Sequence, residues 1–181
     1  MLKVHEEVEK SEFKGTIMDI ETIGDFDRSY YDSRRYANLL PVILGCMTNN
    51  VLRIYYVEKK KEIRDLEQKI IEVLSGLKKP FYAFNCEFEV GVLFHSCGQK
   101  VRFDYELNQE KFESKGGVVR LLGINSYDDP FNDVGRLCAE AWLRGEVKKC
   151  IRHNRSCLLK ERDILLRRGS RKPDDFTLVS V

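Results

Sequence analysis

The chain has 181 residues, of which 43% are hydrophobic and 33% charged, with 12 Gly and 4 Pro, and this composition excludes a disordered protein and a collagen-like fibre. The length predicts one domain over residues 1–181, with its core at about 13–168 and a tail at 169–181. The formal net charge is only +2, but residues 144–172 hold 11 Lys or Arg against 3 acids, as in a phosphate-binding surface or a solvated helix face.

No segment resembles a membrane span or a secretory signal. The longest uncharged stretch, residues 36–52, contains Pro41 and three Asn, which are poorly suited to a bilayer. The six cysteines show no two-residue spacing of the kind that zinc ribbons use, so reduced thiols are expected. A cytoplasmic protein without a membrane partner is therefore predicted.

The first third of the chain predicts three strands, at residues 14–20, 42–47 and 51–57. The short polar link Thr48-Asn49-Asn50 joins the last two strands and predicts a hairpin. Residues 61–77 then carry apolar side chains at helical spacing, with charges on the other face, as in an amphipathic helix.

The central part predicts a short buried strand at 81–84 that leads into a helix at 87–95. The order to this point is therefore β-β-β-α-β-α. Residues 99–126 are ambiguous, with a possible strand at 101–105.

The final third is predicted to be mostly helical. Asp129-Pro130 suits a helix start, with Asp as the N-cap and Pro at the first helical position. Helical periodicity covers 136–142 and 147–166, and Gly169 follows as a stop signal. The end of the tail, 177–181, suits either a docked strand or a frayed end.

Asp19 and Glu21 lie at the end of the first predicted strand, and alternation along a strand points both carboxylates to one side. Such a pair suits Mg²⁺ or Mn²⁺, because these cations prefer oxygen ligands. Solvated acids at an exposed strand end are the alternative interpretation.

A second group, Phe84-Asn85-Cys86-Glu87-Phe88-Glu89, lies where the fourth strand should lead into a helix. Glu87 and Glu89 then lie near the positive end of that helix, where carboxylates are favoured. Asn85 as an N-cap, with acids in the first turn, is the simpler interpretation.

A third group lies on the basic helix, where His153, Cys157 and Glu161 follow at intervals of four residues and share one stripe. A single His in such a helix is most often a surface residue. No single group indicates a function, so the interpretation depends on the order of the three groups along the chain.

In that order they resemble the motifs of the DEDD superfamily of 3′–5′ exonucleases, a ribonuclease H-like group. Asp19-Ile20-Glu21-Thr22-Ile23-Gly24 is similar to the first motif, and Asn85-Cys86-Glu87-Phe88-Glu89 approximates the second, with Glu89 in place of the usual Asp. His153-Asn154 lies where the third is expected. The resemblance implies a three-layer α/β/α fold with a mixed five-stranded sheet, and a nuclease of DNA or RNA.

The resemblance also implies a two-metal site that holds Mg²⁺ or Mn²⁺ through Asp19, Glu21, Glu89 and Cys157. His153 would take the proton of the attacking water, since its pKa is near neutral. Phe84, Asn85 and Phe88 would contact the terminal nucleotide of a single-stranded 3′ end, although core packing is the alternative for Phe88. Four bases would bind phosphates: Lys148, Lys149, Arg152 and Arg155.

The final motif departs from the family pattern. The last Asp of the family falls four residues after a Tyr or five after a His, and those positions here are Cys157 and Leu158. Glu161 lies one turn, about 6 Å, further along the helix. A thiolate is a poor Mg²⁺ ligand, so a weakened site or a preference for Mn²⁺ or Zn²⁺ is expected. A nucleic-acid-binding relative without catalysis is the alternative function.

Overall fold

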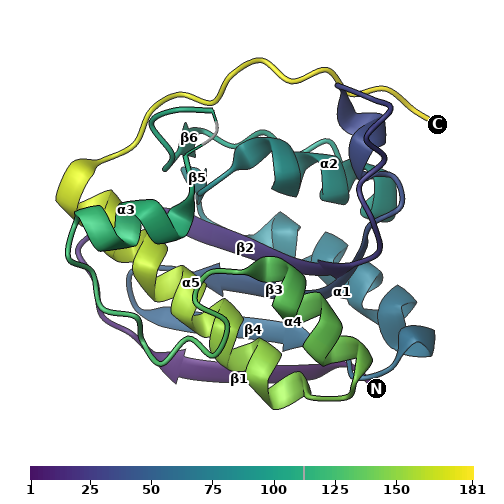
Figure 1. The fold of residues 1–181 in the computed structure, drawn as a ribbon, viewed down its shortest axis with the longest axis horizontal. Coiled ribbons are helices and arrows are strands. Elements are labelled where there is room, and N and C mark those ends of the chain that lie inside the picture. The colour runs from purple at the N-terminus through teal and green to yellow at the C-terminus, as the bar shows by residue number, and fades with distance from the viewer. Residues whose placement is uncertain (112) are drawn as a thin grey trace.

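A computed structural model describes residues 1–111 and 113–181, and over these residues the chain forms one mixed sheet with helices on both faces (Figure 1). The strands are β1 (Lys3–Val8), β2 (Thr16–Ile23), β3 (Leu40–Met47), β4 (Val51–Tyr56), β5 (Phe81–Ala83) and β6 (Tyr105–Glu106). Their order is β1-β4-β3-β2-β5-β6. The three pairs β1–β4, β4–β3 and β3–β2 are antiparallel, whereas β5 is parallel to both of its neighbours, β2 and β6.

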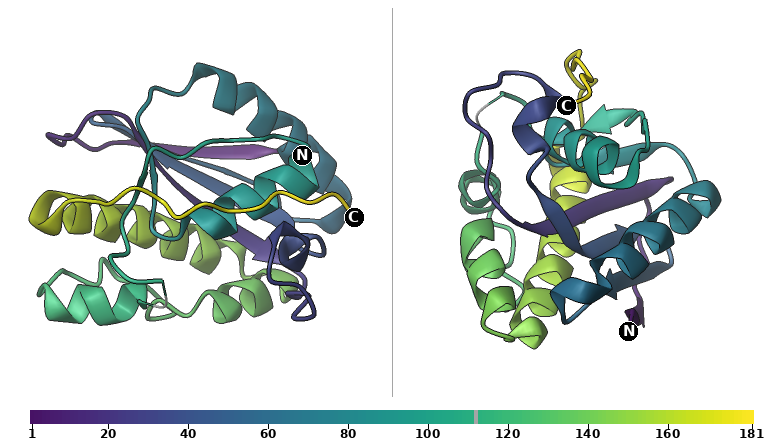
Figure 2. Two further views of the ribbon diagram at one scale, coloured as in Figure 1. Left: turned by 90° about the horizontal axis from the view of Figure 1, so that it is seen from above. Right: turned by 90° about the vertical axis from the view of Figure 1, so that its right-hand side faces the viewer.

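Helices cover the two faces of this sheet. They are α1 (Ile63–Gly76), α2 (Cys86–Cys97), α3 (Lys115–Leu121), α4 (Gly135–Leu143) and α5 (Val147–Arg168), with short 3-10 turns η1 (Ser33–Tyr36) and η2 (Lys60–Glu62). α1 and α2 pack together on one face, and α4 and α5 pack on the other (Figure 2). The central strand β2 is therefore buried on both faces, with seven of its eight residues buried.

The predicted α/β class is confirmed, and the hairpin of β3 and β4 is found as expected. The expected count of five strands differs, because the described residues form a sheet of six. The additional strand β1 pairs along the outer edge of β4, and its residues alternate between half-buried and exposed. This strand was not predicted, because its sequence is rich in Lys, His and Glu and lacks an apolar run. Its position is determined by backbone pairing with β4.

The four predicted helices at 61–77, 87–95, 136–142 and 147–166 are found with shifts of a few residues. The ambiguous segment contains an unexpected helix, α3, and only two strand residues, in β6. A helix start at Asp129-Pro130 is wrong, since α4 begins at Gly135. Asp129 instead accepts hydrogen bonds from the backbone N–H groups of Phe131 and Asp133, both at 2.9 Å, and so closes a turn.

The buried apolar side chains form one core cluster that extends from Phe13 to Ile164. All six cysteines are free and buried, in agreement with the expected reduced thiols. No helix among the described residues has the length and apolarity needed to cross a membrane.

The tail runs extended across the molecule, past β6 and α2 towards η1 (Figures 1 and 2). A single bridge pairs Arg171 with Glu106, and the hydroxyl of Ser33 accepts a hydrogen bond from the backbone N–H of Val179 at 2.8 Å. Residues 177–181 are therefore docked without forming a regular strand.

Candidate active site

Asp19 and Glu21 occupy alternate positions in the middle and second half of β2, and both are largely buried, at 7% and 8% exposure. Asp19 receives a hydrogen bond from the side-chain amide of Asn154 on α5, with Nδ2 to Oδ2 at 2.7 Å. Its other oxygen, Oδ1, lies 2.9 Å from the Nζ of Lys115. The carboxylate of Asp19 is thus fixed between α5 and the first residue of α3.

Gly45 makes the approach of α5 possible. It lies on β3 directly opposite Asp19, and a Cβ atom there would come within 2.2 Å of the Asn154 Oδ1. Any larger residue would displace the side chain of Asn154 and break its contact with Asp19. The missing side chain at this position therefore helps to build the site.

Glu89 lies in the first turn of α2 and is 4% exposed. Burial raises its pKa well above the ordinary value, and the carboxylates of Asp19 and Glu161 add to this effect. No hydrogen-bond donor among the described residues serves its buried oxygen Oε2. Such an orphaned buried oxygen calls for a proton or a cation.

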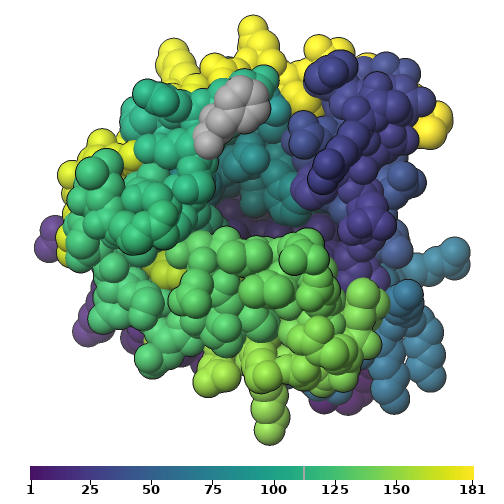
Figure 3. Space-filling view, viewed as in Figure 1, coloured from purple at the N-terminus to yellow at the C-terminus, as the bar shows by residue number. Residues whose placement is uncertain are grey.

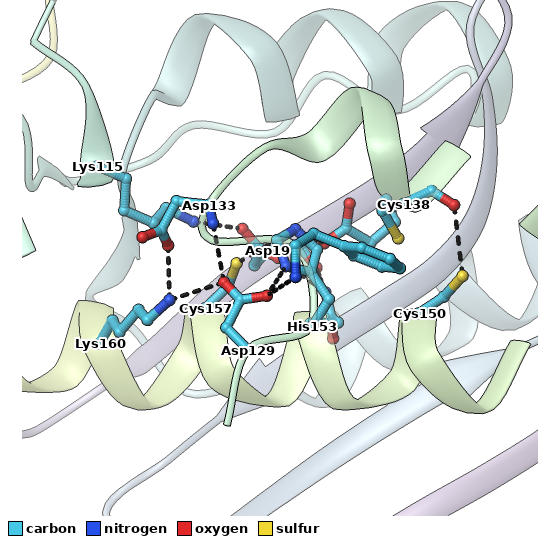
Figure 4. A network of polar contacts seen from close by, with 12 residues as sticks. Asp19, Lys115, Asp129, Asp133, Cys138, Cys150, His153, Cys157 and Lys160 are labelled. Carbon is cyan, nitrogen blue, oxygen red and sulfur yellow. Dashed lines mark hydrogen bonds and ion pairs between the residues drawn. The ribbon is translucent and has the colours of Figure 1, made fainter. Parts of the chain in front are cut away.

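His153 belongs to a chain of buried polar contacts on the other side of the site (Figure 4). Its Nδ1 donates to Asp129 Oδ1 at 2.7 Å, and Asp129 Oδ2 lies 2.7 Å from the Nζ of Lys160. Lys160 also reaches Asp133 Oδ1 at 2.8 Å. Burial favours the neutral imidazole, but the negative groups around His153 outweigh burial and raise its pKa, so the near-neutral pKa expected for a proton acceptor is not found in the metal-free site.

Cys157 is one turn after His153 on α5 and is 3% exposed. Its Sγ lies 3.8 Å from His153 Nε2, and this nitrogen lies 3.7 Å from Glu21 Oε1. One ligand atom each from Glu21, His153 and Cys157 lies within 4.8 Å of the other two. Burial raises the pKa of the Cys157 thiol to about 11, although Lys115 and His153 favour the thiolate.

Glu161, one further turn along α5, is fully buried. The Nζ of Lys115 lies 2.5 Å from its Oε1 and therefore connects Glu161 to Asp19. Burial alone would raise the pKa of Asp19, but the ammonium of Lys115 keeps it below the ordinary value. For Glu161 burial prevails over Lys115, and its pKa is raised to about 8.

The site contains a cavity of about 210 Å³ next to a larger hollow of about 540 Å³. The cavity is bounded by Asp19, Glu21, Phe84, Asn85, Phe88, Glu89, Lys115, His153 and Cys157, among others. Figure 3 shows a depression between the green segment that contains α4 and the dark blue segment before η1, with purple atoms of β2 at its floor. Phe88 also packs between Phe26 and Tyr36, at centroid distances of 6.1 and 6.0 Å.

The structure thus brings together Asp19, Glu21, Glu89, His153 and Cys157, together with the predicted nucleotide contacts Phe84, Asn85 and Phe88. Asn85 precedes α2 but makes no capping hydrogen bond with its side chain. Glu106 takes that role, since its Oε1 accepts from the backbone N–H of Cys86 at 2.9 Å.

The predicted phosphate-binding bases do not line this cavity. Arg155 is paired with Glu7 on β1, with Nε 2.6 Å from Oε1, and Lys149 pairs with Glu146, the residue directly before α5. Arg152 and Lys148 are exposed on α5 outside the cavity. Within the cavity the lysine is Lys115, which the sequence did not indicate.

Four carboxylates in the site, those of Asp19, Glu21, Glu89 and Glu161, face two cationic groups, Lys115 and His153. The pKa values of Glu21, Glu89 and Glu161 are raised, so these groups tend to hold protons in the metal-free site, and together with the orphaned Glu89 oxygen this fits the replacement of protons by a bound cation. The donor set does not fit an all-oxygen pair of Mg²⁺ ions. Cys157 supplies sulfur where the family has a carboxylate, and Lys115 already neutralises Asp19 and Glu161.

A pH dependence follows for the metal-free protein. Burial, with help from Asp19, raises the pKa of Glu21 to about 7 despite the nearby His153, and Glu161 reaches about 8. A raised carboxyl pKa means that the folded state binds protons more tightly, so stability falls as the pH rises from about 4.5 towards 8. The raised pKa values of Glu21 and Glu161 together correspond to a loss of about 6 kcal/mol between pH 5 and 8, to be measured by urea unfolding in EDTA.

The variant Glu161→Gln provides the comparison, because it removes one of the raised carboxyl titrations and keeps the size of the side chain. Its stability should fall less steeply over the same range, and an identical slope would contradict the assignment to Glu161. Added divalent cation should flatten the wild-type slope.

Comparisons of this chain with protein-family models, with curated proteins and with solved structures give no match. The assignment of function therefore depends on the geometry of the cavity and on the motif resemblance.

Proposed function

We propose that the chain is a metal-dependent 3′–5′ exonuclease of the DEDD type, which hydrolyses phosphodiester bonds of DNA or RNA. One observation carries the proposal: side chains from three distant motifs, on β2, α2 and α5, line one small cavity. Asp19, Glu21, Glu89 and His153 all lie there, as the motif resemblance requires.

The architecture supports a ribonuclease H-like fold as part of this proposal. Without the edge strand β1 the sheet keeps five strands, in the order β4-β3-β2-β5-β6, and is mixed as the resemblance implies. Helices lie on both faces, and the acidic pair is on the central strand. The six free thiols suit a reducing cytoplasm.

The residues of the chain divide the tasks of phosphodiester cleavage between them. A bound cation would supply charge neutralisation and activation of water. Lys115, between Asp19 and Glu161, adds a fixed positive charge that suits a phosphate. Asp129 orients His153 through Nδ1, so Nε2 faces Glu21 and Cys157, where it can exchange a proton or bind a metal ion.

The larger hollow beside the cavity provides a place for a nucleotide. It shares Ile20, Glu21 and Phe88 with the cavity and adds Phe26 and two arginines, Arg28 and Arg136. Aromatic faces stack on any base, and arginines bind phosphate, so this surface suits a single-stranded 3′ end without sequence preference.

A second candidate function, a non-catalytic nucleic-acid-binding relative, is favoured by two observations. Cys157 replaces the final carboxylate, and the ammonium of Lys115 occupies the space between two carboxylates that a cation would otherwise bridge. The ammonium of Lys115 thus supplies positive charge that a second ion would otherwise bring.

An exonuclease assay separates the two candidates. A 5′-labelled single strand is incubated with Mg²⁺, Mn²⁺ or Zn²⁺, and we expect stepwise release of single nucleotides from the 3′ end with at least one ion. The variant Cys157→Asp, which restores the family carboxylate, should raise the rate with Mg²⁺. The nuclease would be excluded, and the binding function supported, if the wild type and Cys157→Asp both bound the strand but released no nucleotides with any of the three ions.

A further inference from the structure

Three different ligand types converge at one corner of the cavity. Glu21 offers a carboxylate oxygen, His153 an imidazole nitrogen and Cys157 a sulfur, and all three are at most 8% exposed. The mixture of N, O and S donors is typical of zinc and related transition metals, whereas Mg²⁺ prefers oxygen alone.

Two of the three separations between these atoms, those to His153 Nε2, are close to the values of tetrahedral coordination, and the third is within 4.8 Å. Bonds of about 2.0 Å to oxygen or nitrogen and 2.3 Å to sulfur place neighbouring ligands about 3.3–3.5 Å apart. His153 Nε2 lies 3.7 Å from Glu21 Oε1 and 3.8 Å from Cys157 Sγ. Shifts of a few tenths of an ångström would therefore close these two contacts around one ion.

The surroundings of His153 are those of a metal-binding histidine. Asp129 accepts the Nδ1–H at 2.7 Å, which orients the ring and leaves Nε2 to face the other two ligands. A carboxylate behind the imidazole is the usual outer partner of such a ligand. Lys160 and two backbone N–H groups in turn hold Asp129, so the orientation is fixed by buried contacts.

The remaining carboxylates are arranged differently. Asp19 and Glu161 both contact the ammonium of Lys115, which takes the place of a second cation. The site therefore has two parts. In one, the carboxylates of Asp19 and Glu161 share the ammonium of Lys115, and in the other, Glu21, His153 and Cys157 face one another without an ion pair to any lysine among the described residues.

We propose that Glu21, His153 and Cys157 bind a single transition-metal ion of the zinc class, with the fourth position open to the cavity. Three protein ligands and one open position are typical of catalytic rather than structural zinc sites. In its bearing on catalysis this inference rests on the proposed function, whereas the metal site is tested without any activity measurement.

The test uses the full chain after removal of metals. Titration with Zn²⁺ against a chromophoric chelator should give one ion per chain, and Co²⁺ should produce the intense sulfur-to-metal charge-transfer absorption of a thiolate complex. Cys157→Ser should abolish this absorption and weaken Zn²⁺ binding at least tenfold. Asp129→Asn should weaken binding by about 10–100-fold while the absorption remains.

The matched control is Cys97→Ser, another buried cysteine, at the far end of α2. It should leave both the stoichiometry and the absorption unchanged. A Co²⁺ complex of the wild-type chain without thiolate absorption would overturn the inference, even if a variant failed to fold. Thiolate absorption in a chain that releases no nucleotides would support the metal site and count against the nuclease.

Discussion

Replacement of Asp19 by asparagine (Asp19→Asn) is expected to lower the rate of single-nucleotide release by about 10²–10³-fold, the range found when one preorganised electrostatic group is removed from an active site. The Asp19 carboxylate contacts both Lys115 and Asn154 and so sets the positions of groups from α3 and α5. An amide of the same shape removes the negative charge that these contacts and a bound cation require.

The fold should survive this change. An amide oxygen can still accept the hydrogen bond from Asn154, and Lys115 keeps its contact with Glu161. The cost in stability should therefore stay near the value of one altered buried hydrogen bond, about 1–3 kcal/mol. Circular dichroism and thermal unfolding would verify that a loss of activity is not a loss of structure.

Asp65→Asn provides the matched control, because Asp65 is an exposed aspartate on α1, on the other face of the sheet. Its rate should equal that of the wild type. If Asp19→Asn also kept the full rate, the nuclease activity would have to come from residues outside this cavity.

The elements that the sequence predicted well are those with a strong local pattern. The helix α1 has apolar residues at helical spacing, and β3 and β4 are apolar runs joined by a polar turn. β1 and α3 lack such patterns. β1 is stabilised by pairing with β4, and α3 begins with Lys115-Gly116-Gly117, two poor helix formers after an Ser114 cap.

The candidate site shows the same division. Asp19, Glu21, Glu89 and His153 were predicted from their motifs and do line the cavity. Lys115 could not be predicted, because its contact with Asp19 bridges 96 positions of the sequence and depends on a helix without a pattern. Asp129 was predicted to cap a helix. The structure places it in a turn instead, and the sequence could not separate the two, because in both an Asp side chain accepts hydrogen bonds from backbone N–H groups.

The basic residues of α5 were interpreted either as a phosphate-binding surface or as a solvated helix face. In the structure some of them lie on the surface and one lies in the core. Arg155 and Arg162 pair with Glu7 and Glu9 on or beside β1, which joins the last helix to the first strand. Lys160, on the same helix, is only 1% exposed and lies within the core. A count of charges along the sequence cannot separate these positions, because the side of the helix that faces the sheet is set by tertiary packing.

Lys160→Met is expected to destabilise the protein by about 3–5 kcal/mol, the usual cost of removing one partner from a buried ion pair. Methionine fills a similar volume but leaves the buried carboxylate of Asp129 without its 2.7 Å contact to Nζ, and Asp133 without its 2.8 Å contact. For a domain of this length the loss corresponds to roughly 10 °C in the midpoint of thermal unfolding. Lys148→Met, at an exposed position of the same helix, should change stability by less than about 0.5 kcal/mol.

The pH dependence of the Lys160→Met effect distinguishes a lost ion pair from lost packing. Burial would raise the pKa of Asp129, but the hydrogen bonds from His153 and Lys160 hold it below the ordinary value of about 3.8. Such a group stabilises the fold above pH 3.8, and its contribution is lost as the pH falls through the lowered pKa. Without Lys160 the pKa of Asp129 rises, so the difference between wild type and variant should be full at pH 7 and shrink as the pH falls below 3.8 towards the lowered pKa of the wild type. A difference that stays constant over this range would assign the loss to packing of the methionine instead of to the buried charges.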